Sequence, residues 1–197
     1  MSGLDKLPYP EGRARFMCAP SDDISTWTPS TAWKKNLVLY QWAAIAGRLL
    51  NGAGVKYSIG GMYLEFDNSG SAVDPPPTFD RARTISYYNN MNTENSNRDY
   101  LRVPLSSTQL LSSDSSLYPD GNQCIFFSRS QGLTGVHGNQ FSSDDNSVIF
   151  GASLVAFVDD TDATQDLLLS SIYFATSDQQ AKLSTSQVGI EWELTLQ

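Results

Sequence analysis

The stretch QVGIEWELTL (residues 187–196) carries the clearest strand pattern of this 197-residue chain. Its apolar residues alternate with its other residues over five steps: Val188, Ile190, Trp192, Leu194 and Leu196 on one side, and Gly189, Glu191, Glu193 and Thr195 on the other. Because successive side chains of a strand point to opposite faces, one face is expected to be buried and the other to meet water. The acidic residues are expected to discourage edge-to-edge pairing.

Other parts of the chain share this period of two. They are VKYSIGGMYLEF (55–66), ARTISYY (82–88), DYLRVPL (99–105), NQCIFFSRS (122–130), NSVIFGASLVAFV (146–158) and DLLLSSIYFA (166–175). Stretches rich in Gly, Pro, Asn and Asp separate them, as is typical of turns between strands. Since strands do not alternate with helices here, a parallel α/β fold is disfavoured. The pattern predicts a mainly β fold, an antiparallel, jelly-roll-like β-sandwich.

One helix is expected in addition, at about residues 32–51. Val38, Trp42 and Ile45 recur there at helical spacing, and Gly52 supplies the left-handed position at which helices end. The segment is apolar on most of its circumference, so the helix is expected to pack against the sheet and against a second surface.

Residues 1–30 are expected to form an extended arm in front of the β-sandwich domain, residues 31–197. Prolines and glycines interrupt regular structure in this segment. Its aromatic side chains indicate that the arm lies against another surface, such as a neighbouring subunit. The arm and the helix together supply the predicted subunit contacts: Tyr9, Phe16, Trp27, Trp33, Tyr40 and Trp42.

The composition narrows the range of partners. A net charge of −8 makes nucleic acid an unexpected partner, because phosphate binding needs clustered Lys and Arg. The sequence shows no signal peptide and no apolar run long enough for a membrane span, so production in a cytoplasm is expected. Cys18 and Cys124 lack the spacing of a metal or redox motif, which favours reduced thiols over a long-range disulfide.

No enzyme motif is complete, so we expect no catalytic residues, no metal and no cofactor. His137 is the one histidine, and it lies in a glycine-rich stretch without a nucleophile motif nearby. The acidic segment 159–166 begins like a calcium loop but lacks the glycine and glutamate that an EF-hand requires. Glu65, Glu191 and Glu193 lie on expected strands and could flank a sugar cleft, although the sequence fixes no separation between them.

Several segments resemble structural proteins of tailed-bacteriophage virions: NLVLYQWAAIAGRLLNGAG (36–54), KYSIGGMYLEFDN (56–68), ISYYNNM (85–91), RDYLRVPL (98–105), SVIFGASLVAFVDD (147–160), TQDLLLSSIYFA (164–175) and QVGIEWELTL (187–196). The resemblance spans most of residues 33–197. It implies a non-enzymatic β-sandwich component of the virion, located at the head–tail neck, in the tail or on the capsid surface as a decoration protein. It also implies assembly in the host cytoplasm, with copies of itself and other virion proteins as partners.

Two alternatives remain open at this level. The first is a carbohydrate- or receptor-binding β-sandwich module, and the second is a glycan hydrolase that uses carboxylates on the sheet. The Asn-rich segment 89–97 is expected to be the tip of a hairpin that contacts a neighbour or a receptor. Pro104 is expected to place its strand at a sheet edge or at a strand end, because proline cannot donate to a ladder.

Overall fold

Strand β11 (Gln187–Leu196) has a hydrogen-bonded strand on each side, because β1 (Glu11–Ala19) and β7 (Cys124–Ser130) pair with its two edges. This arrangement comes from a computed structural model. The model describes residues 11–19, 26–38, 57–67, 85–88, 100–112, 124–133, 148–158, 162–181 and 186–196. The acidic strand is therefore internal to the sheet.

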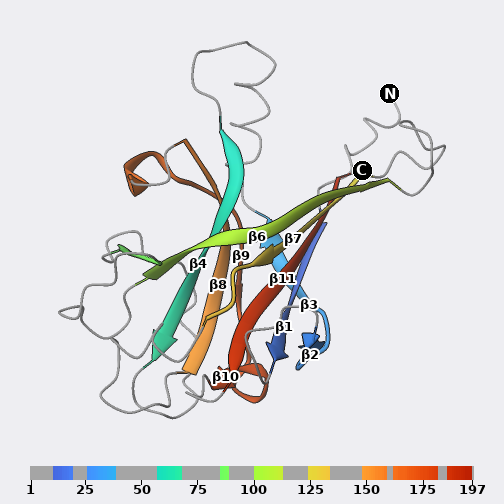
Figure 1. The fold of residues 1–197 in the computed structure, drawn as a ribbon. Helices are drawn as coiled ribbons and strands as arrows, with labels where there is room; N and C mark the ends of the chain where they lie inside the picture. The colour runs from blue at the N-terminus through green and yellow to red at the C-terminus, as the bar shows by residue number, and fades with distance from the viewer. Residues whose placement is uncertain are drawn as a thin grey trace, which may run out of the picture.

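Eight strands close into an antiparallel barrel (Figure 1). The order around the barrel is β8 (Val148–Phe157), β4 (Ser58–Asp67), β6 (Tyr100–Ser112), β7, β11, β1, β3 (Lys34–Val38) and β9 (Leu167–Tyr173), and β9 pairs back onto β8. Three short strands lie off this path: β2 (Thr28–Pro29) beside β1, β5 (Ile85–Tyr87) parallel to β6, and β10 (Gln180–Ala181) beside β8. Two 3-10 helices, η3 (Ala163–Gln165) and η4 (Thr176–Asp178), flank β9.

The mainly β prediction is confirmed, but the prediction of a jelly-roll-like β-sandwich is wrong, because two strands turn corners and close the sheet. Strand β6 pairs with β4 through Tyr100–Pro104 and with β7 through Leu105–Ser112. Strand β3 pairs first with β1 and then with β9. Pro104 therefore lies inside β6 at a corner, next to a register shift between Leu105 and Ser107, and not at a strand end.

The prediction of a helix at about 32–51 is wrong where the structure describes the segment. Lys34–Val38 form strand β3, in which exposed and partly buried residues alternate. Lys35 and Leu37 point outward, and the backbone finds its partners on β1 and β9. Pairing between strands distant in sequence thus overrides the local helical spacing. Residues 39–51 lie outside the described residues.

The interpretation of residues 1–30 as an extended arm is also wrong for Glu11–Ala19, which is a full barrel strand. Strand β1 pairs with β11 over its whole length. Ala14 and Phe16 point into the barrel, whereas Arg13 and Arg15 point out. A division of the chain after residue 30 would separate β1 from the barrel that it helps to close.

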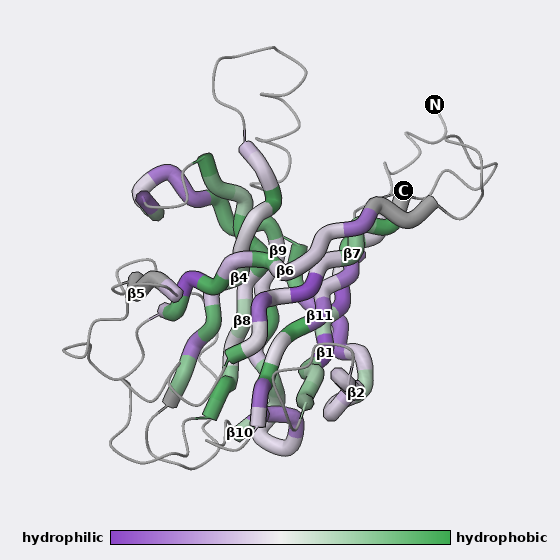
Figure 2. Tube along the Cα trace, viewed as in Figure 1, coloured by the Kyte–Doolittle hydropathy of each residue, from purple (hydrophilic) through white to green (hydrophobic). Residues whose placement is uncertain are grey.

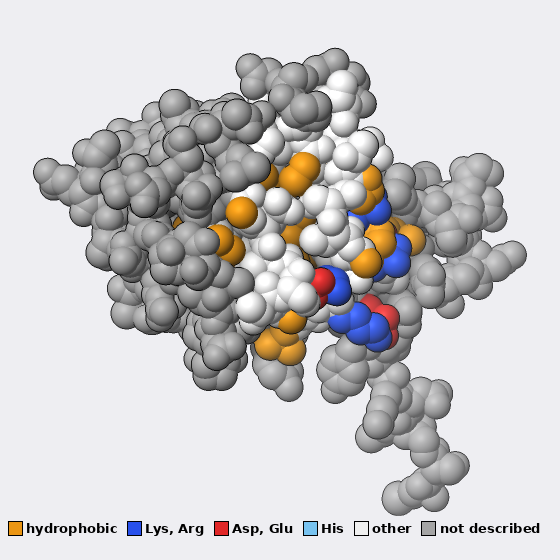
Figure 3. Space-filling model, turned by 90° about the horizontal axis from the view of Figure 1, so that it is seen from below, with side chains coloured by type: hydrophobic (Ala, Val, Ile, Leu, Met, Phe, Trp, Pro, Cys, Tyr) orange, Lys and Arg blue, Asp and Glu red, His pale blue; other side chains and the backbone are white. Residues whose placement is uncertain are grey.

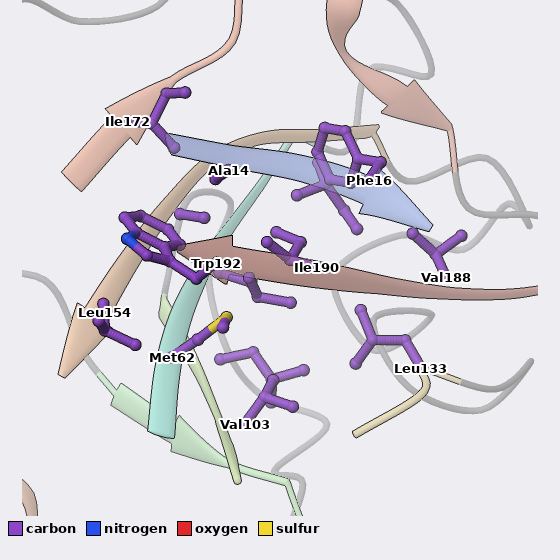
Figure 4. Close-up of a cluster of buried hydrophobic side chains, with 14 of the residues drawn as sticks. Ala14, Phe16, Met62, Val103, Leu133, Leu154, Ile172, Val188, Ile190 and Trp192 are labelled. Carbon is purple, nitrogen blue, oxygen red and sulfur yellow. The ribbon is translucent and has the colours of Figure 1, made fainter. Parts of the chain in front are cut away.

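The barrel interior is filled with side chains from all parts of the chain (Figure 4). Members of this cluster include Ala14, Phe16, Met62, Leu64, Leu154, Ile190 and Trp192, all with exposed fractions near zero. Along β11, hydrophobic residues alternate with more hydrophilic ones (Figure 2). Burial of each large side chain stabilises the fold by roughly 1.5–3 kcal/mol.

One polar network lies at the inner corner where β3 closes the barrel. With its amide in the orientation that satisfies its neighbours, Asn36 accepts from Trp192 Nε1 at 2.8 Å and from the Arg13 backbone N–H at 3.1 Å. Its amide nitrogen donates to Ser170 Oγ at 2.8 Å and to the Gly12 carbonyl at 3.0 Å. Asn36 thereby joins β3 to β1, β9 and β11.

Candidate functional site

The outer face of β1, β11 and β7 carries a row of paired charges, which we call the arginine–glutamate ladder. Its members are Arg13, Arg15, Arg129, Glu191 and Glu193. The strand register places Arg13 opposite Glu193, and it places Glu191 between Arg15 and Arg129. Seen from below in Figure 3, acidic and basic side chains lie next to one another on the surface.

Glu191 is the centre of this ladder, and its side chain is only 2% exposed. One carboxylate oxygen accepts from Arg15 Nε at 2.7 Å and lies 2.6 Å from Arg15 Nη2. The other accepts from Arg129 Nε at 3.0 Å and also from Arg129 Nη2. Two guanidinium groups therefore compensate the desolvation of one buried carboxylate.

The outer end of the ladder is more exposed. Arg13 Nη2 donates to Glu193 Oε2 at 2.9 Å, and the Arg13 side chain is 48% exposed. The guanidinium groups of Arg13 and Arg15 lie over the Trp33 ring at 4.8 Å and 4.4 Å from its centroid. These cation–π contacts hold Trp33, one of the predicted contact residues, against the charged row.

The carboxylates considered for glycoside hydrolysis do not face one another across a cleft. Glu191 and Glu193 are held by arginines. Glu65 lies on β4, and it points away from the interior because its neighbours Leu64 and Phe66 fill the core. Three steps around the barrel separate β4 from β11. The pair of facing acids that a glycosidase needs is not formed by these three residues.

A second charged group lies on the outer face of β4 and β6, and we call it the Tyr63–Arg102–Asp166 cluster. Arg102 donates from Nε to Asp166 Oδ2 at 2.8 Å and from Nη2 to Oδ1 at 3.0 Å. Tyr63 Oη also donates to Asp166. The side chains of Arg102 and Asp166 are 5% and 3% exposed, and the Phe157 ring lies 4.1 Å below the guanidinium.

Burial raises the pKa of the Asp166 carboxyl, while the hydrogen bonds from Arg102 and Tyr63 and the charge of Arg102 oppose the rise. The cluster joins the residue before β9 to β4 and β6. The cluster is a structural contact between these elements, because Arg102 and Tyr63 of the same chain bind the carboxylate oxygens of Asp166.

Trp27, another predicted contact residue, packs against its own chain. It forms a small cluster with Met17 and Ala19 and is 9% exposed. A Cβ added at Gly189 would lie 2.0 Å from Trp27 Cζ3, and one added at Gly132 would lie 2.8 Å from Cζ2. The two glycines therefore leave the space that the indole fills.

Phe16 packs in the barrel interior. Tyr9, Tyr40 and Trp42 lie outside the described residues, as do His137 and the Asn-rich segment 89–97. The ladder arginines were missed as functional candidates. In the sequence, Arg13 and Arg15 alternate with Ala14 and Phe16, which is a strand pattern. The prolines on either side led to the prediction of an arm instead.

Two other sequence features have local structural roles. Asp162, in the segment that begins like a calcium loop, caps η3 by accepting from Thr164 N and Thr164 Oγ1, each at 2.9 Å. Cys18 is a free thiol, and in the strand register it lies opposite Val188, at one end of β11. The backbone of Cys124 lies opposite Leu196, at the other end of β11. Eight residues of strand separate these ends by about 27 Å, which is too far for a disulfide.

Among the described residues, no group of three or more His, Cys, Asp or Glu could hold a metal ion. The described part of the chain also contains no helix with the length and apolar character of a membrane span. Comparisons with protein-family models, with curated proteins and with solved structures found no match.

Proposed function

We propose that this protein is a non-enzymatic structural component of a bacteriophage virion, which assembles as a homo-oligomer at the head–tail neck, in the tail or on the capsid surface. The observation that carries this proposal is the filled barrel: side chains such as Phe16, Met62 and Trp192 occupy the interior. Eight-stranded barrels that hold a small ligand need that space empty. Because its interior is filled, the barrel can bind partners through its outer surface and its loops. Proteins that assemble with other subunits bind through such surfaces.

The charged groups support the same reading. Glu191, Glu193 and Asp166 are each bound to an arginine of the same chain. These pairs engage the carboxylates within the chain, as is typical of structural ion-pair networks. The cation–π contacts on Trp33 likewise occupy part of a ring that a sugar would need for stacking.

Composition and resemblance add to the proposal. Charged residues make up only 17% of the chain, so its polar surface is largely uncharged. The sequence segments that resemble virion proteins include those that form β6, β8 and β11, three strands of the barrel. The expected partners are further copies of this chain and other virion proteins.

Quantitative mass spectrometry of purified virions tests the proposal. Particles of the phage that encodes the chain should contain it at a fixed ratio to the major capsid protein, through successive density gradients. The soluble fraction of the same lysate is the control. A chain found only in the soluble fraction, with none in the particles, would contradict the proposal.

A further inference from the structure

The outer surface of the barrel has a buried side and an exposed side. On β4 and β8, side chains that point away from the interior are buried, namely Tyr63, Glu65, Ser153 and Val155. Strands β1 and β11 lie across the barrel from β4 and β8. On that side Arg13 is 48% exposed, and Leu37, on the neighbouring β3, is 64% exposed. We call the outer surface of β3, β1, β11 and β7 the ladder face.

The residues of the ladder face are of the types that protein interfaces favour. Three of them are arginines, and Trp33 and Phe127 add partly exposed aromatic rings. Arginine and aromatic residues are enriched in the interfaces between proteins. Among the described residues, two large apolar side chains are exposed, Leu37 on this face and Val158 at the end of β8. The face therefore offers apolar contacts as well as charges to a partner.

Charge is distributed unevenly between the ladder face and the rest of the chain. The described residues of the face carry four basic and three acidic side chains: Arg13, Arg15, Lys35 and Arg129, and Glu11, Glu191 and Glu193. Of the 13 basic and 21 acidic residues of the chain, the other nine and eighteen lie elsewhere. The net charge of −8 thus arises outside the face, so the rest of the molecule is electrostatically complementary to it.

The most acidic part of that remainder includes β8, η3 and β9. Residues 130–181 contain seven Asp and neither Lys nor Arg. Within this range Asp166 is bound to Arg102, whereas Asp162 is exposed at the start of η3. Val158, the second exposed apolar side chain, lies four residues before Asp162. An exposed carboxylate and an exposed apolar group thus occur together here, as an exposed cation and Leu37 do on the ladder face.

We infer that the ladder face of one subunit docks on the η3 region, around Asp162, of a second copy of this chain. This inference rests on the proposed homo-oligomeric function and names the two surfaces through which subunits meet. Because the two surfaces differ, the contact is head-to-tail and closes into a ring when the rotation between subunits allows it. Two acidic chains associate in this way because the cations of one face an acidic region of the other.

Substitutions at exposed positions of the face test the docking. Leu37→Ser removes the apolar side chain, and Lys35→Gln removes one positive charge. Each should raise the dissociation constant by about fivefold or more, because the side chain is lost from the contact. Thr108→Glu, at an exposed position of β6, changes the net charge as Lys35→Gln does and should leave the constant unchanged, as should Lys35→Arg. Light scattering over a concentration series measures all of them.

Mixing tests the head-to-tail arrangement. The double variant Lys35→Gln/Leu37→Ser keeps the η3 region, and Asp162→Asn/Gln165→Lys keeps the ladder face, with asparagine retaining the cap of η3. Each should be monomeric at concentrations at which the wild type associates. Their equimolar mixture should form a dimer with one copy of each, because one intact face then meets one intact η3 region.

Circular dichroism checks that both double variants keep the wild-type fold. If they do, and the mixture stays monomeric while the wild type associates, the inference is wrong. It is also wrong if Asp162→Asn/Gln165→Lys alone associates as the wild type does.

Failure of this inference is distinguishable from failure of the proposed function. A wild-type oligomer whose dissociation constant is unchanged in every variant would overturn the docking of the ladder face on η3 and leave the homo-oligomer intact. A wild-type protein that stays monomeric at every concentration would overturn the docking and the homo-oligomer together. Mass spectrometry of purified virions tests membership of the particle independently of both results.

Discussion

Glu191 and Glu193 are two residues apart on β11, yet their surroundings differ. The Glu191 side chain is 2% exposed and contacts two arginines, whereas Glu193 contacts the half-exposed Arg13. An ion pair in water contributes little, because solvent screens it and the side chains lose entropy. Removing the charge from a buried partner leaves other charges uncompensated and costs more.

Glu191→Gln should therefore lower the free energy of unfolding by about 1–3 kcal/mol, because the two guanidinium groups lose their shared anion. Glu193→Gln is the matched control and should change stability by less than about 0.5 kcal/mol. Urea unfolding followed by circular dichroism measures both. Equal losses from the two variants would contradict the view that burial sets the value of these pairs.

Asp166 predicts a dependence of stability on pH. Burial raises the pKa of its carboxyl in the folded state, so between the ordinary and the raised pKa the folded chain binds more protons than the unfolded chain. The contribution of Asp166 to stability is therefore largest below its ordinary pKa, and it is lost as the pH rises through the raised pKa.

Asp166→Asn removes this titration and isolates the effect. The stability of wild type minus that of Asp166→Asn should decrease as the pH rises through the raised pKa of the Asp166 carboxyl, and then level off. Urea unfolding at closely spaced pH values gives the difference. A difference that grows with pH would mean that Arg102 and Tyr63 outweigh burial and lower the pKa of Asp166.

At the scale of the elements, β11 depends on a contact with a segment that lies outside the barrel. Trp27, just before β2, covers Gly189 on the outer face of β11, and the space above this glycine is filled by the indole. A side chain at position 189 would displace the ring, so the two elements constrain each other.

Gly189→Ala should lower the free energy of unfolding by about 1–3 kcal/mol, because the new methyl group and the Trp27 ring cannot occupy the same space. Thermal and urea unfolding of Gly189→Ala, Trp27→Ala and the double variant form a double-mutant cycle. Gly189→Ala should lower the free energy of unfolding by clearly less in the Trp27→Ala variant than in the wild type. Strict additivity would show that the cost arises in the backbone of β11 and not at the indole.

At the scale of the whole molecule, the paired lengths of neighbouring barrel strands, which we call seams, are unequal. The pairing of β1 with β11 runs from Glu11 to Ala19, whereas the described residues of β3 and β9 pair at Leu37–Ser171 and Val38–Ser170. The Ser170 hydroxyl, which donates to the Leu37 carbonyl at 2.9 Å, reinforces this short seam. Local opening of a fold begins where the fewest interactions hold it.

Native-state hydrogen exchange should reveal the short seam. Amides of β3 and of the facing part of β9 should exchange through a local opening, with a smaller free energy than the amides of β1, β11, β4 and β8. Exchange monitored by nuclear magnetic resonance at low denaturant concentrations gives the free energy for each amide. Exchange of β3 only through global unfolding would contradict the seam as the weak point.

Much of the strand content was predictable from the sequence. The segments that form β4, β5, β7, β8, β9 and β11 all appeared as strands, since the alternation of side chains between two faces is a property of the local sequence. Strand β6 was predicted only as far as Leu105, whereas it continues to Ser112. The buried side of β11, with Val188, Ile190 and Trp192, was correctly identified. The virion function and the contact role of the aromatic residues stay predictions.

The tertiary structure alone decided how the strands join and which charges are buried. Lys34–Val38 lies at the start of the segment for which a helix was expected but is a strand, because β1 and β9 offer it hydrogen-bonding partners. Glu191 was expected to meet water, yet Arg15 and Arg129, from distant parts of the chain, enclose it. Side-chain alternation is a local property that the sequence determines by itself, whereas barrel closure and charge burial arise from contacts between segments far apart in the chain.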